Sequence, residues 1–369
     1  MRIGITVDTS RNTWSSETAQ SAFFIYDILR RSGAECYYIS NGRLAPQGFK
    51  GHKYIDLTKL LEEGGPQFDI ILMGESPLTY PQLNTLKKRN AKCKIIFLSF
   101  HNKLADDAQQ CLFSDSVPVG TYSGVPDLHF LFDEIWISSH HDYQRPYIQT
   151  LFQNENIKPV PYIWDPAPIQ HAIKNTDPQK LFFNPSHPHQ KETSKNICIF
   201  EPNSSFSQNF LVPLIICEKA YVGHKLDIDA INIFNCKKLR SNKGLSSVLS
   251  KLHLTKDKKT YFNNRWGFID AIERWGGAVV SHQTTNELTR LHLECLYLGV
   301  PLIHNCKSLE DAGYFYENSD INEGADQLRL ALVRHAELFD YYKGRAKEYI
   351  AKYSIYNTHN VNAYGKLIS

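Results

Sequence analysis

A run of five polar residues, HQTTN at positions 282–286, separates an apolar segment from a helical pattern. The apolar segment at 278–281 predicts a short strand, and the leucines from Leu288 to Leu298 broadly keep helical spacing. A loop that ends a strand and opens a helix is a common place for phosphate or other anions, because the first helical N–H groups point toward it. These residue types favour a ligand held by hydrogen bonds. The alternative is that they cap the strand, with Asn286 as the N-cap of the helix.

Glu294 belongs to the same helical segment. Gly299 is expected to end this helix, and the apolar residues 300–303, which include Pro301, predict the next strand. A carboxylate can accept hydrogen bonds from two neighbouring hydroxyls, so Glu294 is a candidate to hold a ligand. The alternative is an ordinary surface glutamate on an amphipathic helix. His304 and Asn305 follow the next strand and either line the same site or cap it.

Polar side chains also follow the strands expected in the N-terminal half. Asp8, Glu75, His101 and His140 each come after an apolar run, so a parallel sheet would bring them to one edge. His101, Asp8 and Glu75 are candidates for a general base acting on a hydroxyl. Structural roles at the strand ends are the alternative.

Trp14 and Ser15 occupy the first strand-to-helix loop, where a glycine-rich phosphate fingerprint is missing. Trp14 could stack on a sugar, and a packing role is equally compatible with the sequence. The pair His140-His141 has metal-binding side chains, but neighbours on a strand or loop are expected to point apart. No obligate metal and no cofactor are therefore predicted.

The elements that position these residues alternate between strand and helix. In the N-terminal half we expect strands at 2–7, 36–39, 68–73, 93–99 and 134–138, and helices at 17–32, 81–89, 105–113 and up to residue 152. In the C-terminal half we expect strands at 197–200, 230–234, 260–262, 278–281 and 300–303, and helices at 207–221, 245–252, 265–275, 288–298, 323–339 and 341–353. The pattern predicts two doubly wound α/β domains.

A polar segment divides the two alternations. The 369 residues are expected to form a Rossmann-like N-terminal domain at 1–170 and a Rossmann-like C-terminal domain at 196–345. A linker at 171–195 joins them, and residues 346–369 form a helical tail.

The composition is that of a globular protein, with 42% apolar and 21% charged residues. A net charge of +3 gives no reason to expect nucleic acid as a partner. The eight cysteines are scattered without a CxxC pair, which favours buried reduced thiols and a cytoplasmic location. The N-terminus has no signal-peptide pattern, and no run reaches the ~20 apolar residues of a membrane helix. Peripheral membrane contact through a basic patch stays open.

The segment from Glu294 through Gly299 and Pro301 resembles the nucleotide-binding segment of two-domain glycosyltransferases of the GT-B fold. Most of the chain is similar to a poorly characterised bacterial and viral family of GT-B-like proteins. The similarity lies in RIGITV, NTWSSETAQSAFFIYDILRRSG, FDEIWIS, VPYIWDP, EPNSSFSQNFLVPLIICEKAY, VVSHQ, LECLYLGVPLIHN, DAGYFY and YSIYNTHNVNAY. The resemblance implies two Rossmann-like domains that face a central cleft.

The resemblance also implies a nucleotide-sugar donor in the C-terminal domain and a glycan or other hydroxyl acceptor in the N-terminal domain, where Trp14 and Ser15 would bind it. The implied donor-binding residues are Glu294, His282, Gln283, Thr284, Asn286, Arg265, Asn203, Gln208, His304 and Asn305. Asn286 stands where many retaining enzymes carry an acid. Asn203 and Gln208 stand where those enzymes carry Arg and Lys to hold the diphosphate. Arg265, Lys237 and Lys238 are candidates to replace that pair.

We therefore expect a metal-independent glycosyltransferase, of the kind that builds polysaccharides. A sugar-nucleotide epimerase of the same fold is one alternative, and a non-catalytic nucleotide- or glycan-binding protein is another. The sequence leaves open the donor base and sugar, the acceptor, the oligomeric state, and whether the anomeric configuration is inverted or retained.

Overall fold

The computed structural model describes residues 1–8, 17–40, 51–74, 76–114, 116–121, 131–176, 181–186 and 194–369. The chain divides into two compact units. Unit 1 holds Met1–Pro168 and Tyr353–Ser369, and unit 2 holds Ile169–Lys352. The C-terminal segment therefore belongs with the N-terminal sheet, whereas the sequence analysis treated residues 346–369 as a separate tail.

Unit 1 is built on one parallel sheet. Its strands among the described residues are β1 (Arg2–Thr6), β2 (Glu35–Ser40), β3 (Tyr54–Asp56), β4 (Ile70–Met73), β5 (Lys94–Ser99), β6 (Glu134–Ser138) and β7 (Ile157–Val160). They lie in the order β3-β2-β1-β4-β5-β6-β7, and every pair is parallel. Its helices are α1 (Glu17–Arg31), α2 (Leu57–Glu62), α3 (Tyr80–Arg89), α4 (Lys103–Phe113), η2 (Ser139–Gln144), α5 (Arg145–Phe152) and α14 (Thr358–Ile368), with α6 (Ala167–Ala172) at its border. Strands buried on both faces explain the continuous apolar runs in the sequence.

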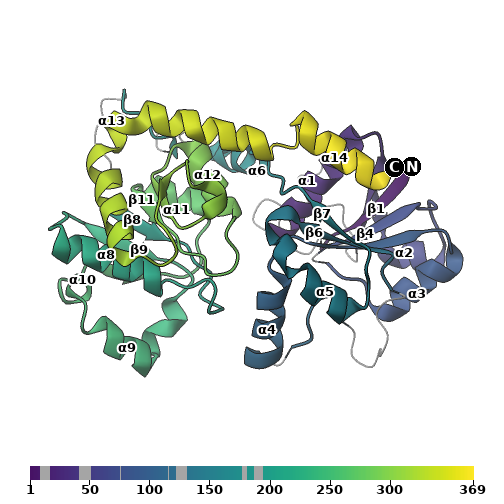
Figure 1. The fold of residues 1–369 in the computed structure, drawn as a ribbon, viewed down its shortest axis with the longest axis horizontal. Coiled ribbons are helices and arrows are strands. Elements are labelled where there is room, and N and C mark those ends of the chain that lie inside the picture. Colours follow the sequence, from purple (N-terminus) through teal and green to yellow (C-terminus); the bar gives the residue numbers. More distant parts are fainter. Residues whose placement is uncertain are drawn as a thin grey trace. The chain divides into compact units, whose positions relative to one another are not determined.

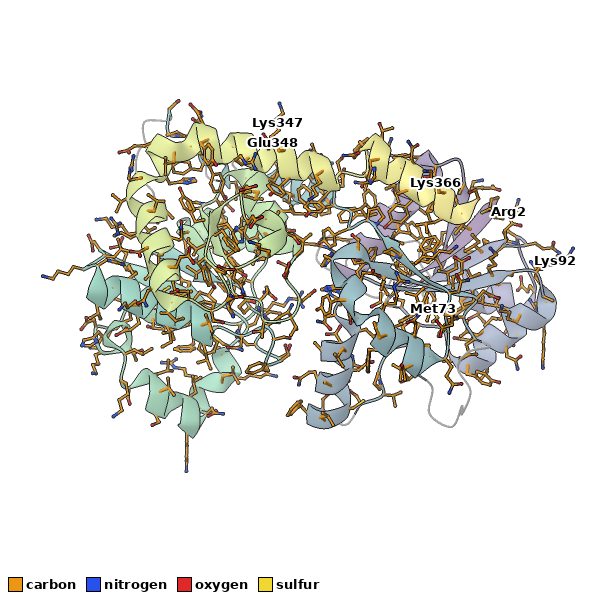
Figure 2. All side chains as sticks on the ribbon, viewed as in Figure 1. Arg2, Met73, Lys92, Lys347, Glu348 and Lys366 are labelled. Carbon is orange, nitrogen blue, oxygen red and sulfur yellow. The ribbon has the colours of Figure 1, made fainter. Side chains whose placement is uncertain are left out.

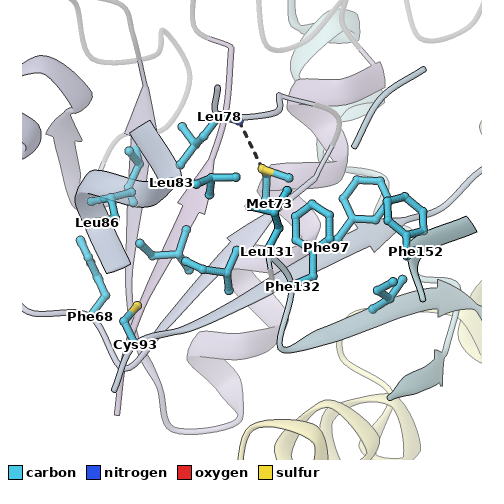
Figure 3. Close-up of a cluster of buried hydrophobic side chains, with 14 of the residues drawn as sticks. Phe68, Met73, Leu78, Leu83, Leu86, Cys93, Phe97, Leu131, Phe132 and Phe152 are labelled. Carbon is cyan, nitrogen blue, oxygen red and sulfur yellow. Dashed lines mark hydrogen bonds between the residues drawn. The ribbon is translucent and has the colours of Figure 1, made fainter. Parts of the chain in front are cut away.

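Aromatic and aliphatic side chains fill one core of unit 1 (Figure 3). Phe97, Phe132 and Phe152 pack with ring centroids 5.3–5.7 Å apart. Met73 lies fully buried beside them, whereas Lys92 and Lys366 lie at the periphery of the unit (Figure 2). Packing of Met73 in this core fixes the C-terminal end of β4, which lies at the carboxyl edge of the sheet.

The C-terminal helix α14 packs against α1 (Figure 1). The Ser32 hydroxyl donates to the Val361 carbonyl at 2.9 Å, and the buried Tyr364 hydroxyl donates to the Pro161 carbonyl at 2.9 Å. Asn357 caps α14 by accepting from the His359 N–H at 2.9 Å. These contacts make the end of the chain an integral part of unit 1.

Unit 2 repeats the same architecture. Its strands are β8 (Asn196–Ile199), β9 (Ala230–Ile233), β10 (Thr260–Phe262), β11 (Ala278–Val280), β12 (Leu302–His304) and β13 (Tyr314–Phe315). They are parallel, in the order β10-β9-β8-β11-β12-β13. Its helices among the described residues are η3 (Ile173–Asn175), α8 (Leu211–Gly223), η4 (Lys237–Ser241), α9 (Lys243–Leu249), α10 (His253–Lys256), α11 (Phe268–Trp275), α12 (Arg290–Leu298), η5 (Lys307–Leu309) and α13 (Ile321–Tyr353). Both units thus show the predicted doubly wound α/β organisation.

Several predicted elements differ from the structure. The two helices predicted at 323–339 and 341–353 form one helix, α13, because Asp340 between them is no helix breaker. Strands β3, β7 and β13 were not predicted, because they are too short to show a clear pattern. Helix α11 was predicted to begin at Arg265, but it begins at Phe268 after Gly267. Seven of the eight cysteines are buried, as expected, and Cys111 is exposed.

Each sheet reverses its strand order once. In unit 1 the reversal falls between β1 and β4, and in unit 2 it falls between β8 and β11. Loops diverge at such a point, so the carboxyl ends of these strands border a crevice, which is where open α/β sheets bind ligands. The two switch points therefore define where to look for a site.

Candidate functional site

Glu201, a buried carboxylate, occupies the switch point of unit 2. It lies two residues after the end of β8 and is 1% exposed. Its Oε1 accepts from the Ser281 hydroxyl at 2.8 Å and from the His282 N–H at 3.1 Å, and its Oε2 accepts from the Gln283 side-chain amide at 2.7 Å. Through Glu201, the segment that follows β8 is hydrogen-bonded to the end of β11 and to the start of the polar loop.

Ser281 links this carboxylate to helix α12. Its single hydroxyl proton goes to Glu201, so its oxygen accepts from His292 Nε2 at 3.1 Å. The His292 ring thus carries its proton on Nε2. Ser281 and His292 are both 0% exposed, and the imidazole acts as donor, not as base. The arrangement is therefore a structural relay and not a nucleophilic serine.

His282, the first predicted donor-binding residue, is held on both ring nitrogens. Tyr316 donates its hydroxyl proton to the Ser281 carbonyl at 3.1 Å, so the same oxygen accepts from His282 Nδ1 at 2.9 Å. Nε2 then accepts from the Ser319 hydroxyl at 3.3 Å. Because His282 is only 5% exposed, its role in this structure is to hold the loop.

Gln283 and Thr284 continue the loop. The Asn305 side chain accepts from the Gln283 N–H at 2.9 Å and donates to the Gln283 carbonyl at 2.8 Å. The Thr284 N–H donates to the Ser207 carbonyl at 3.0 Å, which joins the loop after β11 to the loop after β8. The Thr284 side chain is exposed, and Gln283 Oε1 is buried with no hydrogen-bond partner among the described residues.

Burial dominates the electrostatics of this network. It raises the pKa of Glu201 to about 7, although the three donors to its carboxylate oppose the shift. Burial also lowers the pKa of His282 to about 4 and that of His292 well below its usual value. The imidazoles are therefore neutral at neutral pH.

Glu294 lies on the outward side of α12. Arg290, Glu294 and Tyr297 are half-buried and share one face at helical spacing, while His292 and Leu296 face the interior. The network holds α12 through His292, while Glu294 lies on the half-buried face of the helix. Asn286 is 9% exposed and is not the N-cap of α12, because Thr289 occupies that position.

Three other predicted donor-binding residues take part in local structure. The Asn203 amide donates to the Glu201 and Phe234 carbonyls at 2.8 and 2.9 Å and accepts from the Phe210 N–H at 2.9 Å. The Gln208 carbonyl accepts from the Asn203 N–H at 3.1 Å. His304 is 0% exposed, and its ring bonds the Ala312 carbonyl at 2.7 Å and the Cys306 N–H at 3.1 Å. Asn203 and His304 thus stabilise the loops in this structure.

The cationic candidates Lys237, Lys238 and Arg265 lie in the loops that follow β9 and β10, at one side of the sheet. The N–H groups of Cys236 and Lys237 donate to the Asn263 carbonyl at 3.2 Å, so the loops after these strands are joined. Lys237, Lys238 and Arg265 are all exposed in these loops. Cationic side chains therefore lie at the same carboxyl edge as the Glu201 network.

The switch point of unit 1 carries a small pocket instead of a closed network. Apolar side chains, hydroxyls and one glycine line it: Ile5, Thr6, Ser21, Ala22, Ile25, Leu72, Gly74, Ser76, Leu98 and Phe100. The Thr6 hydroxyl is buried and has no hydrogen-bond partner among the described residues. A ligand hydroxyl or a water molecule could satisfy it.

His101 and His140 lie at the same edge, after β5 and β6. The proximity of His101 and His141 adds to burial in lowering the pKa of His140, to about 3. The expectation that the His140 and His141 rings point apart was wrong, because η2 brings their centroids to 4.0 Å. Asp8 follows β1 and is exposed. Glu75, Trp14 and Ser15 lie outside the described residues.

Two further features bear on the kind of site. No group of three or more His, Cys, Asp or Glu side chains suited to a metal ion occurs in the described part of the chain. Within that part, too, no helix is long and apolar enough to cross a membrane.

The family described as "Protein of unknown function (DUF2827)" matches residues 3–368 of the sequence. The chain belongs to this family. Among curated proteins none matches it.

Solved structures of GT-B glycosyltransferases have the same fold as this DUF2827 protein. A TarM mutant from S. aureus, in complex with Fondaparinux, alpha-GlcNAc-glycerol and UDP, is 16% identical with a TM-score of 0.54. The match covers 85% of this chain, which spans only 58% of the length of TarM. The pneumococcal O-GlcNAc transferase GtfA, in complex with UDP and GlcNAc, is 8% identical with a TM-score of 0.54, and the match covers 100% of this chain and 98% of GtfA.

A UDP-forming alpha,alpha-trehalose-phosphate synthase from Burkholderia xenovorans is 10% identical with a TM-score of 0.59. The match covers 99% of this chain and 97% of the synthase. At these identities the likeness establishes the GT-B fold, which confirms the resemblance seen in the sequence.

Sequence reasoning missed the centre of the unit 2 network in this DUF2827 protein. It took His282 and Gln283 as ligand contacts and gave no role to Glu201, Ser281 or His292. The available signal was a carboxylate directly after the first strand of a doubly wound domain, where a ligand-binding crevice is expected. A single-residue pattern of this kind does not reveal that the carboxylate is buried.

Proposed function

We propose that this protein is a glycosyltransferase that moves a sugar from a nucleotide-sugar donor to a hydroxyl acceptor. Unit 2 binds the donor and unit 1 binds the acceptor. The observation that carries the proposal is the fixed loop at 281–286, which is held at the β8/β11 switch point by Glu201, Asn305 and the Ser207 carbonyl. Because its own N–H groups at 282–284 are engaged in these bonds, the rigid loop acts by positioning the exposed Thr284 side chain and the N-terminus of α12, which can donate to a diphosphate.

The donor residues divide into contacts and supports. Glu294 accepts hydrogen bonds from the ribose hydroxyls, and Thr284 with Asn286 faces the diphosphate or the sugar. Glu201, His282, Gln283, Asn203 and Asn305 hold the loops in place, as their hydrogen bonds indicate. Gln208 borders the same loop.

The leaving diphosphate needs positive charge. Asn203 is neutral and its side chain is engaged, so it cannot supply that charge. Arg265, Lys237 and Lys238 at the ends of β9 and β10 are our candidates, with the α12 N-terminus adding partial charge. We propose that this cationic set makes an obligate metal unnecessary.

The acceptor hydroxyl binds in unit 1 near the β1/β4 pocket, with Trp14 and Ser15 as candidate contacts. Its oxygen forms a bond to the anomeric carbon while the bond to the diphosphate oxygen breaks, and its proton passes to a base. His101, Asp8 and Glu75 are the candidates for that base if the configuration is inverted. The pocket lining supports an acceptor that presents an uncharged hydroxyl.

Isothermal titration calorimetry with free nucleotides and nucleotide sugars tests the donor site. The names of the neighbours mention UDP, so uridine nucleotides come first. Glu294→Ala should weaken nucleotide binding by about 1–3 kcal/mol, which is the range for loss of a charged hydrogen-bond partner. Glu337→Ala, on the exposed surface of α13, is the matched control and should leave the affinity unchanged.

Turnover assays separate the remaining alternatives. A transferase consumes its donor with an acceptor present, whereas an epimerase converts the sugar of its donor without one. A protein that only binds nucleotide does neither. The neutral Asn203, which stands where a cation was expected, favours this non-catalytic protein as the second candidate function. An unchanged affinity in folded Glu294→Ala would remove Glu294 from the site.

A further inference from the structure

One segment of unit 2 has a larger net positive charge than the whole chain. Residues 237–258, here called the basic lobe, contain the cations Lys237, Lys238, Arg240, Lys243, Lys251, Lys256 and Lys258. Asp257 is their only acidic residue, so the lobe has a net charge of +6, against +3 for the whole chain. All other residues together therefore carry −3.

The cations of the basic lobe are exposed to solvent. None of these Lys and Arg side chains forms a salt bridge to a described residue, whereas Lys195 pairs with Asp227 at 2.7 Å and Arg334 pairs with Glu337 at 2.8 Å elsewhere in unit 2. Asp257 accepts from the Tyr221 hydroxyl at 2.8 Å instead. Helix α9 lies at the edge of its unit, so the lobe presents unneutralised charge to solvent (Figure 1).

Apolar side chains lie among these cations. Val248 on α9 is 46% exposed, and Leu239 and Leu245 are half-buried. Tyr261 on β10 is 51% exposed, and Trp266 follows in the loop that is hydrogen-bonded to the start of the lobe. Exposed apolar and aromatic side chains between lysines match the boundary between lipid headgroups and acyl chains.

We propose that the basic lobe docks unit 2 on a membrane surface that contains anionic lipid. Clusters of four to eight Lys or Arg are attracted to such surfaces, while the negative remainder of the chain is repelled and sets the orientation. Nucleic acid is the weaker match, because α9 offers Leu245 and Val248 where a base-reading helix carries Arg, Asn or Gln. The docking does not depend on glycosyl transfer or on a bound nucleotide.

Vesicle sedimentation with the full chain tests this docking. The protein should bind vesicles that contain phosphatidylserine, should not bind vesicles of phosphatidylcholine alone, and should be released by salt. The double variant Lys243→Glu/Lys251→Glu should reduce partitioning at least about tenfold, since each basic residue contributes independently near the surface. Lys237 and Lys238 stay intact because they are candidate donor contacts.

A matched double variant controls for net charge. Lys347 on α13 and Lys366 on α14 are exposed and lie outside the lobe (Figure 2), so Lys347→Glu/Lys366→Glu changes the charge equally and should keep binding. Arg240→Glu/Lys258→Glu replaces the first lobe variant if that one does not fold. Equal binding by the lobe and control variants would overturn the proposal. Binding to an oligonucleotide but not to vesicles, with the same loss in the lobe variant, would also overturn it.

Discussion

The two units share one topology but differ at their switch points. In unit 1 the ends of β1 and β4 border a pocket of apolar side chains and hydroxyls, and the Thr6 hydroxyl there has no partner among the described residues. In unit 2 the ends of β8 and β11 are joined by Glu201, with three hydrogen bonds to its carboxylate. The same strand order can therefore leave a crevice open or build a rigid loop at its mouth. In the proposed function, the first arrangement receives a ligand group and the second positions atoms that contact one.

We expect the largest difference between the two units in their loss of stability at acid pH. Unit 2 buries the neutral imidazoles of His282, His304 and His335, with pKa values of about 4, and of His292, whose pKa is also well below its usual value. The unfolded chain takes up these protons near pH 6.5, so this stability is present above pH 6.5 and lost as the pH falls toward 4, by up to about 1.4 kcal/mol per pH unit for each histidine. Hydrogen exchange followed by mass spectrometry should show unit 2 losing protection first.

Glu201 acts in the opposite direction. Its pKa is raised from 4.5 to about 7, so its contribution is present below pH 4.5 and lost as the pH rises through about 7. Protonation of Glu201 therefore offsets part of the stability that unit 2 loses at low pH. One carboxyl group cannot compensate for the protonation of several histidines. Loss of protection in unit 1 at the same pH as in unit 2, or before it, would contradict the comparison.

A pair of glycine substitutions should show the next largest difference. Gly277, before β11, has φ +87° and a Cβ there would lie 1.9 Å from the Asn196 carbonyl oxygen. Gly33, before β2, has φ +92° and open space around it. Gly33→Ala should destabilise by about 1–2 kcal/mol through backbone strain alone, and Gly277→Ala by well above that because β8 must move. Urea denaturation measures both, and equal effects would show that the approach of β11 to β8 is not restrictive.

Substitution of Glu201 tests whether the network holds the loop. Glu201→Ala leaves the Ser281 hydroxyl, the His282 N–H and the Gln283 amide without an acceptor, at about 1–3 kcal/mol each if they stay buried. Thermal and chemical denaturation should show a loss of about 3 kcal/mol or more, together with weaker nucleotide binding. Glu201→Gln is the matched control. Gln283 can turn its amide to meet it, so we expect a change within about 1 kcal/mol and no titration near pH 7. A neutral effect of Glu201→Ala would refute the supporting role.

Thr6→Val should have the smallest effect on stability. Valine has nearly the same shape, and the hydroxyl it removes is buried without a partner among the described residues. Removal of an unsatisfied polar group is neutral or slightly stabilising, within about 1 kcal/mol. If the hydroxyl binds the acceptor, the same variant should raise the KM for acceptor and leave donor affinity unchanged. A marked loss of stability would instead show that Thr6 has a structural partner.

The alternation of strands and helices, the doubly wound class and the place of the 282–286 loop could all be predicted from the amino-acid sequence. Apolar periodicity and strand ends are local properties of the chain, so they could be seen without coordinates. Helix α13 was predicted as two shorter helices, because a pattern of surface residues does not show whether two helical segments are continuous. The strand ends that hold Asp8, His101 and Glu201 were also visible in the sequence.

The roles of the polar side chains could not be predicted in this way, because they depend on the folded structure. His304 looked like a residue at the mouth of a site, yet it is fully buried and bonded to the Ala312 carbonyl and the Cys306 N–H. Glu201 looked like an ordinary strand end, yet residues eighty positions away donate to its carboxylate. Hydrogen-bond partners and burial depend on segments that are distant in sequence, and burial sets both the pKa and the accessibility of a side chain. Residue type and spacing therefore identified the edge of the sheet that carries the candidate site. The fold was needed to distinguish residues that can contact a ligand from residues that hold the loops in place.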